Sequence, residues 1–174
     1  MNLFWYRMMG AALLARSVYE GIEADPRAMG QALVTVLLSS IAAGIGVAGW
    51  HGPRLEVIVT VAVIALVTWL AWAMLMFQIG GRLMRPGATR TSPGELMRTI
   101  GFAASPGLLQ AFGALPGVTT VAFVAAWIWM LAATVVAVRQ ALDFTSTART
   151  LLVCAVAAGI CLGGSLLLVC VLPV

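Results

Sequence analysis

The sequence predicts an all-α polytopic membrane protein with five transmembrane helices and an N-terminal amphipathic interfacial helix. Of its 174 residues, 62% are hydrophobic and 9% are charged, and the mean hydropathy is +1.05. Soluble domains are roughly half apolar and a quarter charged. Five apolar stretches are each about 20 residues long, which is enough to cross a bilayer as a helix. None carries an ionisable residue in its middle third, so each can be buried in lipid with its backbone satisfied internally.

Residues 1–24 are predicted to form the interfacial helix, which is the first of two domains. At 100° per residue an apolar arc forms from Phe4, Met8, Ala11, Ala12, Ala15, Tyr19 and Ile22. Charged residues lie beside this arc, which is typical of a helix in the plane of the membrane surface. A cleaved signal peptide fits this segment poorly, because its basic start is weak and no small-residue cleavage site follows.

Residues 25–174 are predicted to form a five-helix transmembrane domain. Its spans are expected at residues 27–49, 55–79, 95–114, 118–138 and 148–172. Asp25 can cap the first span, and Pro26 suits a first helical turn, where its missing N–H costs nothing. Turn-forming residues after the first two spans, at 50–53 and 80–81, mark where these helices end.

The third predicted span begins with a capping box and contains a proline. Ser92 and Glu95 are three residues apart, so each side chain can accept a hydrogen bond from the other's backbone N–H. Pro106 lies inside the span, where it removes one backbone hydrogen bond and clashes with the carbonyl of Phe102, so we expect a kink or a break. A tight turn at Pro116 leads to the fourth span, and Thr145 or Ser146 is the expected cap of the fifth.

The basic residues are distributed asymmetrically over the predicted loops. All ten are arginines. With five spans, nine fall on the side of the N terminus: Arg7, Arg16, Arg27, Arg82, Arg85, Arg90, Arg98, Arg139 and Arg149. Only Arg54 falls on the opposite side. The positive-inside rule therefore predicts a cytoplasmic N terminus and an external C terminus.

Four segments together resemble the bacterial members of the YIP domain family, five-span membrane proteins named after eukaryotic relatives that interact with Ypt/Rab GTPases. They are residues 19–26 (YEGIEADP), 100–109 (IGFAASPGLL), 138–142 (VRQAL) and 146–149 (STAR). The resemblance covers residues 20–172. It implies a membrane adaptor without enzymatic activity, placed in the cytoplasmic (inner) membrane of a bacterium.

The residues themselves give no indication of catalysis or metal binding. An intramembrane serine nucleophile needs a histidine or lysine at membrane depth, but the chain has no lysine, and its one histidine, His51, lies in a predicted loop. The spacing of the three cysteines, Cys154, Cys161 and Cys170, matches no metal-ligand pattern. We therefore expect no catalytic residue, no metal and no cofactor. The arginines that give the chain its net charge of +4 are expected to face lipid headgroups, and we expect no binding of nucleic acid.

A ligand cavity near the third-span proline is one candidate functional site. The break exposes a carbonyl, and broken helices line the substrate sites of transporters. The predicted lining residues are Phe102, Pro106, Gln110, Trp69, Trp72, Trp127 and Trp129. The tryptophans lie near span centres, so they either fill the core of the bundle or form the wall of a pocket for a lipid tail or another flat apolar ligand.

Two surfaces are candidate partner interfaces. One is the N-terminal helix with Phe4, Met8 and Tyr19, and the other is a small-residue face of the fifth span with Gly159 and Gly163, which permits close helix approach. The leading hypothesis is a non-enzymatic accessory, adaptor or scaffold protein that binds membrane lipids and either other integral membrane proteins or a second copy of itself. The alternative is a small permease or carrier of lipid or another hydrophobic ligand.

Overall fold

The structure is a computed structural model that describes residues 2–49, 55–83, 92–143 and 146–171. These residues form helices and contain no strands, which confirms the all-α prediction. The α-helices are α1 (Leu3–Ala12), α2 (Arg16–Ala24), α3 (Ala28–Ala48), α4 (Leu55–Met76), α5 (Pro93–Ala103), α6 (Thr119–Ala141) and α7 (Thr147–Val171). A π-helix, η2 (Phe77–Leu83), continues α4, and a 3₁₀-helix, η3 (Ser105–Ala114), continues α5.

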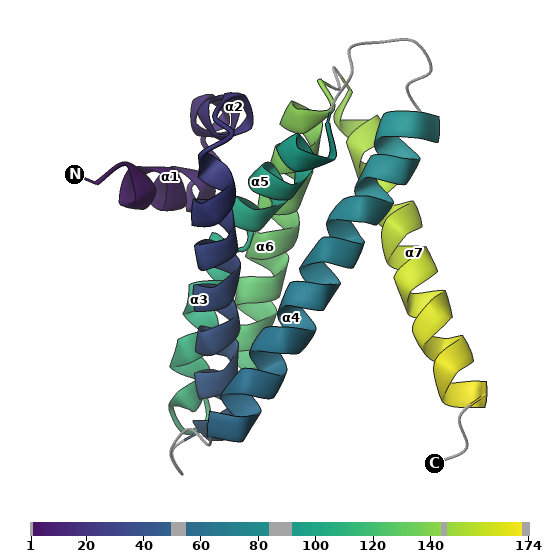
Figure 1. Cartoon of the computed structure of the whole chain (residues 1–174). Coiled ribbons are helices and arrows are strands. Elements are labelled where there is room, and N and C mark those ends of the chain that lie inside the picture. The colour runs from purple at the N-terminus through teal and green to yellow at the C-terminus, as the bar shows by residue number, and fades with distance from the viewer. Residues whose placement is uncertain (1, 50–54, 84–91, 144–145, 172–174) are drawn as a thin grey trace.

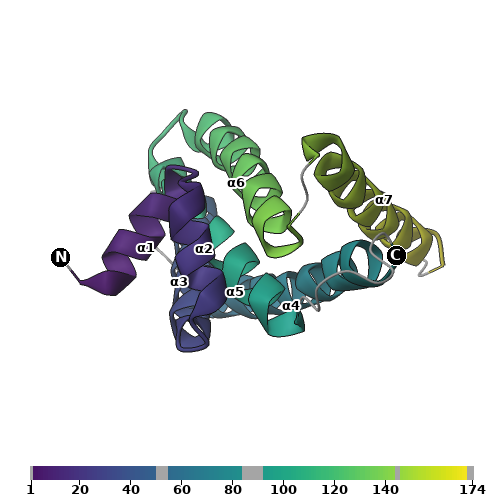
Figure 2. The same cartoon turned by 90° about the horizontal axis from the view of Figure 1, so that it is seen from above.

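The long helical segments run between the two ends of the molecule in alternating directions (Figure 1). They are α3, α4, α5 with η3, α6 and α7. The shorter α1 and α2 lie across α3 and α5 at one end, and α7 stands on the opposite side of the bundle (Figure 2). Among the described residues, α3 and α6 are long and apolar enough to cross a membrane, and shorter apolar helical stretches occur at Leu66–Gly80 and Thr147–Ile160.

The expectation of one continuous N-terminal helix is wrong, because the chain breaks between α1 and α2. The N–H of Ala15 donates to the carbonyl of Gly10 at 2.9 Å, and that of Leu14 to the carbonyl of Ala11 at 3.1 Å. This pair of bonds is the Schellman pattern that ends many helices. Leu14 adopts the left-handed conformation, with φ 60°, at a position where glycine is usual. Its side chain packs against the core, which offsets the backbone strain.

The predicted interruption of the third span is confirmed. Helix α5 ends at Ala103, and the chain continues from Ser105, through Pro106, as the tighter η3. At the other end of α5, Ser92 Oγ accepts from the N–H of Glu95 at 3.3 Å, and Glu95 Oε2 accepts from the N–H of Ser92 at 2.8 Å. The capping box is therefore confirmed as well. Because a 3₁₀-helix rises about 2 Å per residue, η3 extends this segment toward the far end of the bundle.

The described residues contain two apolar core clusters. The first joins α1 and α2 to the bundle and consists of Met8, Ala11, Val18, Tyr19, Ile22, Ala28, Ala32, Phe102, Ala103, Ala133 and Ala137. The second joins α4, η2, α5, α6 and α7 and consists of Ala73, Met76, Ile79, Leu96, Ile100, Val138, Ala141, Leu142, Val153 and Ala157. Both are rich in alanine, which allows the helices to approach closely.

Glycines fit the broken third segment between α3 and α6. A Cβ atom on Gly46 would overlap the carbonyl oxygen of Gln110 and lie 2.8 Å from the ring of Phe123. A Cβ atom on Gly107 would overlap the hydroxyl of Ser39 on α3. These positions have no space for a side chain, so α3 and η3 approach each other closely, with backbone against backbone at Gly46 and Gln110.

We predict that Gly46→Ala destabilises the protein by about 1–3 kcal/mol, because the added methyl group meets backbone that cannot move independently. Gly30→Ala in the same helix is the matched control, since a Cβ atom added to Gly30 would have no other atom within 4 Å. It should be neutral or stabilising by up to about 1 kcal/mol. Thermal unfolding in mild detergent measures both, and equal melting temperatures for the two variants would contradict the packing described.

Candidate functional site

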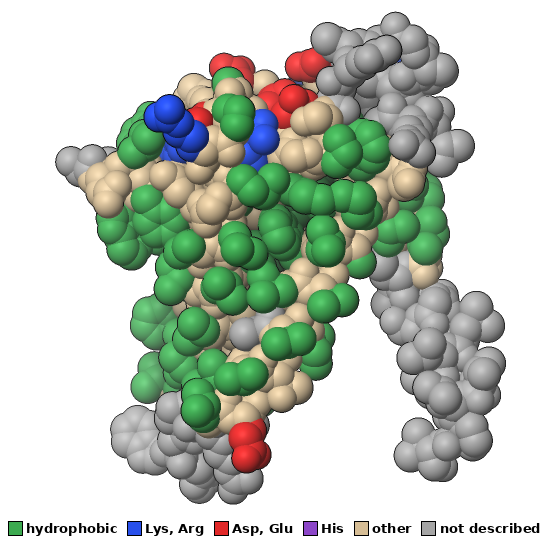
Figure 3. Space-filling view, in the orientation of Figure 1, with side chains coloured by type: hydrophobic (Ala, Val, Ile, Leu, Met, Phe, Trp, Pro, Cys, Tyr) green, Lys and Arg blue, Asp and Glu red, His purple; other side chains and the backbone are tan. Residues whose placement is uncertain are grey.

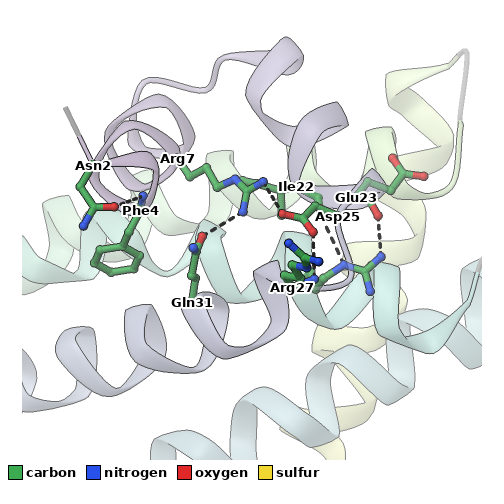
Figure 4. A network of polar contacts seen from close by, with 9 residues as sticks. Asn2, Phe4, Arg7, Ile22, Glu23, Asp25, Arg27 and Gln31 are labelled. Atoms are coloured by element: carbon green, nitrogen blue, oxygen red, sulfur yellow. Dashed lines mark hydrogen bonds and ion pairs between the residues drawn. The ribbon is translucent and has the colours of Figure 1, made fainter.

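The most densely bonded polar site lies where α1 and α2 meet the bundle (Figure 4). Arg98 of α5 is only 8% exposed. Its Nε donates to the carbonyl of Ile22 at 3.3 Å, and its Nη2 donates to the carbonyl of Glu23. Both carbonyls belong to the last turn of α2, where helix carbonyls lack partners. The guanidinium also complements the negative end of the helix dipole, so Arg98 caps α2 and ties it to α5.

A second arginine, Arg7 of α1, connects the three N-terminal helices. Its Nη2 lies 2.7 Å from Oδ2 of Asp25, the residue directly after α2, and its Nη1 donates to Oε1 of Gln31 on α3 at 3.0 Å. The other carboxylate oxygen of Asp25 accepts from the N–H of Arg27 at 2.9 Å. These bonds, the one from Arg7 first, hold the pKa of the Asp25 carboxyl below its usual value. The ion pair therefore persists well below neutral pH.

Two aromatic side chains donate to the last turn of α1. The hydroxyl of Tyr19 donates to the carbonyl of Ala11 at 3.2 Å, and Nε1 of Trp129 donates to the carbonyl of Ala12 at 2.7 Å. Tyr19 is fully buried, and this burial raises the pKa of its hydroxyl. The ring of Phe4 lies against that of Phe102, with centroids 6.4 Å apart. Helix α1 is thus fixed to α2, α5 and α6.

Glu23 is a carboxyl group whose pKa is raised to about 7. Partial burial is the main cause, and the negative charges of Asp143, Glu95 and Glu20 add to it, whereas Arg98 opposes the shift. The four acidic groups come from three parts of the chain: α2, α5 and the residues after α6. The docking of α2 therefore brings like charges together at this end of the bundle.

The three predicted ligand residues of the third segment are buried where α5 gives way to η3. Phe102 is fully buried, and Pro106 and Gln110 lie within the contact between α3, η3 and α6. Beside them, the buried hydroxyl of Ser105 has no hydrogen-bond partner in the structure. These residues fill the junction between helices.

The four predicted tryptophans lie in two further places. Trp69 and Trp72 of α4 pack against the second core cluster, as the core-filling interpretation expects. Trp127 and Trp129 of α6 are 58% and 44% exposed, so for this pair that interpretation is wrong. The structure therefore does not bring the seven predicted ligand residues together.

The predicted partner residues are also divided. Met8 and Tyr19 are buried within the chain, and Phe4 is half-buried against Phe102. Gly159 is exposed, with open space around its Cβ position. The surroundings of Gly163 lie outside the part of the chain that the structure describes, as do His51 and the expected cap Thr145.

Sequence reasoning missed the structural roles of Arg7 and Arg98. Arg7 is the one charged residue in α1, and Arg98 lies on a buried face of α5. An isolated charge on an otherwise apolar helical face is the signal that could have identified them, because such a charge requires a partner. The partners are side chains in one case and backbone carbonyls in the other, and only the fold shows which.

No group of three or more histidine, cysteine, aspartate or glutamate residues in the described ranges is placed to hold a metal ion. The chain matches no family model, no curated protein and no solved structure. Over the described residues, the structure defines an all-α protein with two helices able to span a membrane.

We predict that Arg98→Met loosens α2, because the carbonyls of Ile22 and Glu23 lose a charged donor while the apolar stem is kept. The expected loss is about 1.5–3 kcal/mol, seen as faster hydrogen exchange in residues 16–24. Arg16→Met, which removes an exposed arginine from α2 itself, is the control and should leave exchange unchanged. Equal protection in both variants would show that Arg98 does not cap α2.

We predict that Glu23→Gln raises the melting temperature at pH 8 by about 2–4 °C and leaves it nearly unchanged at pH 5. The pKa of Glu23 is raised from 4.5 to about 7, so the folded state holds this proton more tightly than the unfolded chain. Stability contributed by the protonated group is present at low pH and declines as the pH rises from about 4.5 to about 7. Glu20→Gln, an exposed neighbour, is the control, and a gain that does not depend on pH would contradict this assignment.

Proposed function

We propose that the chain is a five-span integral membrane protein of the bacterial cytoplasmic membrane that acts as a non-enzymatic accessory or scaffold subunit. In this proposal it is a YIP-type protein and binds a helix of another membrane protein, or of a second copy of itself, through the outer face of α7. The observation that carries the proposal is the unpacked small-residue face of α7.

The distribution of side chains supports a membrane location. The sides of the bundle are apolar, and acidic and basic groups gather mainly at one end (Figure 3). Large hydrophobic side chains exposed on the helices include Val59, Val63, Ile64, Val67 and Leu70 on α4 and Val121, Val124, Ile128 and Leu131 on α6. Contiguous apolar surface of this extent is a liability in water, whereas in a bilayer it is covered by acyl chains.

The arginines support the proposed orientation. Helices α2, α5 and α7 begin or end at the end of the bundle where the charged side chains gather, together with the C-terminal end of α6 (Figures 1 and 3). Arg27, Arg98, Arg139 and Arg149 lie on or beside these helix ends. The positive-inside rule makes this end cytoplasmic.

Over Thr147–Ile160, the part of α7 whose side chains the structure describes, the helix is attached to the bundle along one stripe. Thr150, Val153 and Ala157 are buried, at positions that share one face of a helix. Ala155 and Gly159 lie four residues apart on the opposite face, both are exposed, and nothing lies within 4 Å of a Cβ on Gly159. Small residues at this spacing allow a second helix to approach to backbone distance. The carrier alternative has no comparable support, because its ligand residues are dispersed.

We predict that Ala155→Leu combined with Gly159→Leu abolishes a complex that the native protein forms in its membrane. The bulky side chains would separate the two backbones, and we expect at least a tenfold loss of complex, about 1.4 kcal/mol. After extraction in mild detergent, light scattering combined with mass spectrometry measures the mass above that of the 18.2 kDa chain and identifies the second subunit.

Ala125→Leu, at an exposed alanine of α6, is the matched control and should leave the complex intact. A native protein that is monomeric, with no stoichiometric protein partner, would overturn the proposed function. So would a complex that the two α7 substitutions leave unchanged.

A further inference from the structure

Helix α1 exposes an apolar face with no charged side chain. The exposed residues of the helix and its C-terminal cap are Leu3, Trp5, Tyr6, Met9 and Leu13, which are 49–71% exposed. They cover the outer arc of the helix, whereas Phe4, Met8 and Ala11 face the core. Both sides of α1 are therefore apolar, so the helix is not amphipathic in the sense expected from the sequence.

The next helix has a different outer face. In α2 the buried residues are Val18, Tyr19 and Ile22, and the exposed face carries Arg16, Ser17 and Glu20. Helix α2 lies farther than α1 toward the charged end of the bundle (Figure 1). Helix α1 thus presents an apolar surface suited to lipid, whereas α2 presents a polar surface suited to water.

Two contacts of α1 lie away from the charged end of the bundle. The carbonyl of Ala12 is bonded to Trp129, and about 18 Å of helix separates Trp129 from the end of α6 at Ala141. Phe4 lies against Phe102, about 14 Å along α5 from its capped start. Half of the hydrocarbon layer of a bilayer measures about 15 Å, so these contacts lie at hydrocarbon depth if the bundle spans the membrane.

We propose that α1 is immersed among the acyl chains of the cytoplasmic leaflet, with its outer face covered by lipid, while α2 lies at the aqueous surface. This inference rests on the membrane-spanning part of the proposed function. The apolar surface of α1 is continuous with that of α6, because exposed Trp129 joins the end of α1 to the outer face of α6. Acyl chains that cover α6 therefore also cover α1.

The ion pair between Arg7 and Asp25 makes this immersion possible. Arg7 is the one charged group on α1, and an unpaired arginine in hydrocarbon costs about 2.5–3.5 kcal/mol or more. Its bonds to Asp25 and Gln31 neutralise it and direct it toward the charged end. We call this ion pair the latch, because it allows an otherwise apolar helix to lie below the headgroups.

Spin-label depth measurements test the location of α1. In a full-length variant with its three cysteines replaced by alanine, single cysteines carry a nitroxide at Met9→Cys on α1, Ser17→Cys on α2 and Val124→Cys on α6. The protein is reconstituted in phosphatidylethanolamine/phosphatidylglycerol vesicles and exposed to oxygen, which concentrates in lipid, or to a water-soluble nickel chelate. Met9 and Val124 are similarly exposed, at 56% and 53%.

We expect the label at Met9 to be relaxed by oxygen and protected from nickel, as at Val124, and the label at Ser17 to show the reverse. A Val124 label that nickel reaches would show that the bundle does not span the membrane, which overturns the proposed function. A Val124 label in lipid with a Met9 label that nickel reaches would overturn the immersion of α1 alone. A Met9 label shielded from both reagents would show that protein, and not lipid, covers this face, which also overturns the immersion.

The role of the latch is tested with Asp25→Asn in the Met9→Cys background. Unpaired Arg7 should then pull α1 toward the headgroups, and nickel accessibility at Met9 should rise several-fold. Adding Arg7→Met removes the charge and should restore the original depth, which also shows that the variants still fold. Unchanged accessibility in the single variant would overturn the latch.

Discussion

The free carbonyl groups at the ends of the described helices need hydrogen-bond partners, because a buried carbonyl without one destabilises the fold. Arg98 donates to the last carbonyls of α2. Tyr19 and Trp129 donate to those of α1. Near the end of η3, the hydroxyl of Thr119 donates to the carbonyl of Gly113 at 2.6 Å. The side chains that satisfy these carbonyls come from other elements, so the same bonds that complete the helix ends also hold the helices together.

The long helices are predictable from the sequence because hydrophobic length and turn residues determine them. The capping box of α5 and the break near Pro106 follow equally from local chemistry. The break at Leu14 is not predictable, because a left-handed backbone conformation at a helix end is usually indicated by glycine and not by leucine. Its conformation is stabilised by packing against residues distant in the sequence. The two exposed tryptophans of α6 escape prediction for a similar reason: a bulky apolar residue gives no indication of which face of a uniformly apolar helix is buried.

The candidate site is less predictable than the fold. The predicted site residues on η3 and α4 pack between helices. The hydrogen bonds that join the N-terminal helices to the bundle depend instead on Arg7 and Arg98. From the sequence, these two arginines indicate only the membrane topology. The sequence shows that these arginines lie near helix ends, but their partners are about 20 and 75 residues away. The raised pKa of Glu23 has the same origin, because burial and the charges of Glu95 and Asp143 act on it only once α2 has docked.

The strength of attachment varies across the bundle, and this variation bears on where a partner can bind. On one side, α3, η3 and α6 meet through glycines with backbone contact, and α1 and α2 are bonded to them. A partner there would have to displace packed backbone or buried hydrogen bonds. On the other side, α7 is held by a stripe in its first half, and the exposed face opposite the stripe carries the small residues Ala155 and Gly159 beside Leu152. A second helix can add contacts to this face without removing any. In the proposed function, this asymmetry of packing assigns protein contacts to α7 and assigns to the N-terminal helices the positioning of the bundle relative to the leaflet.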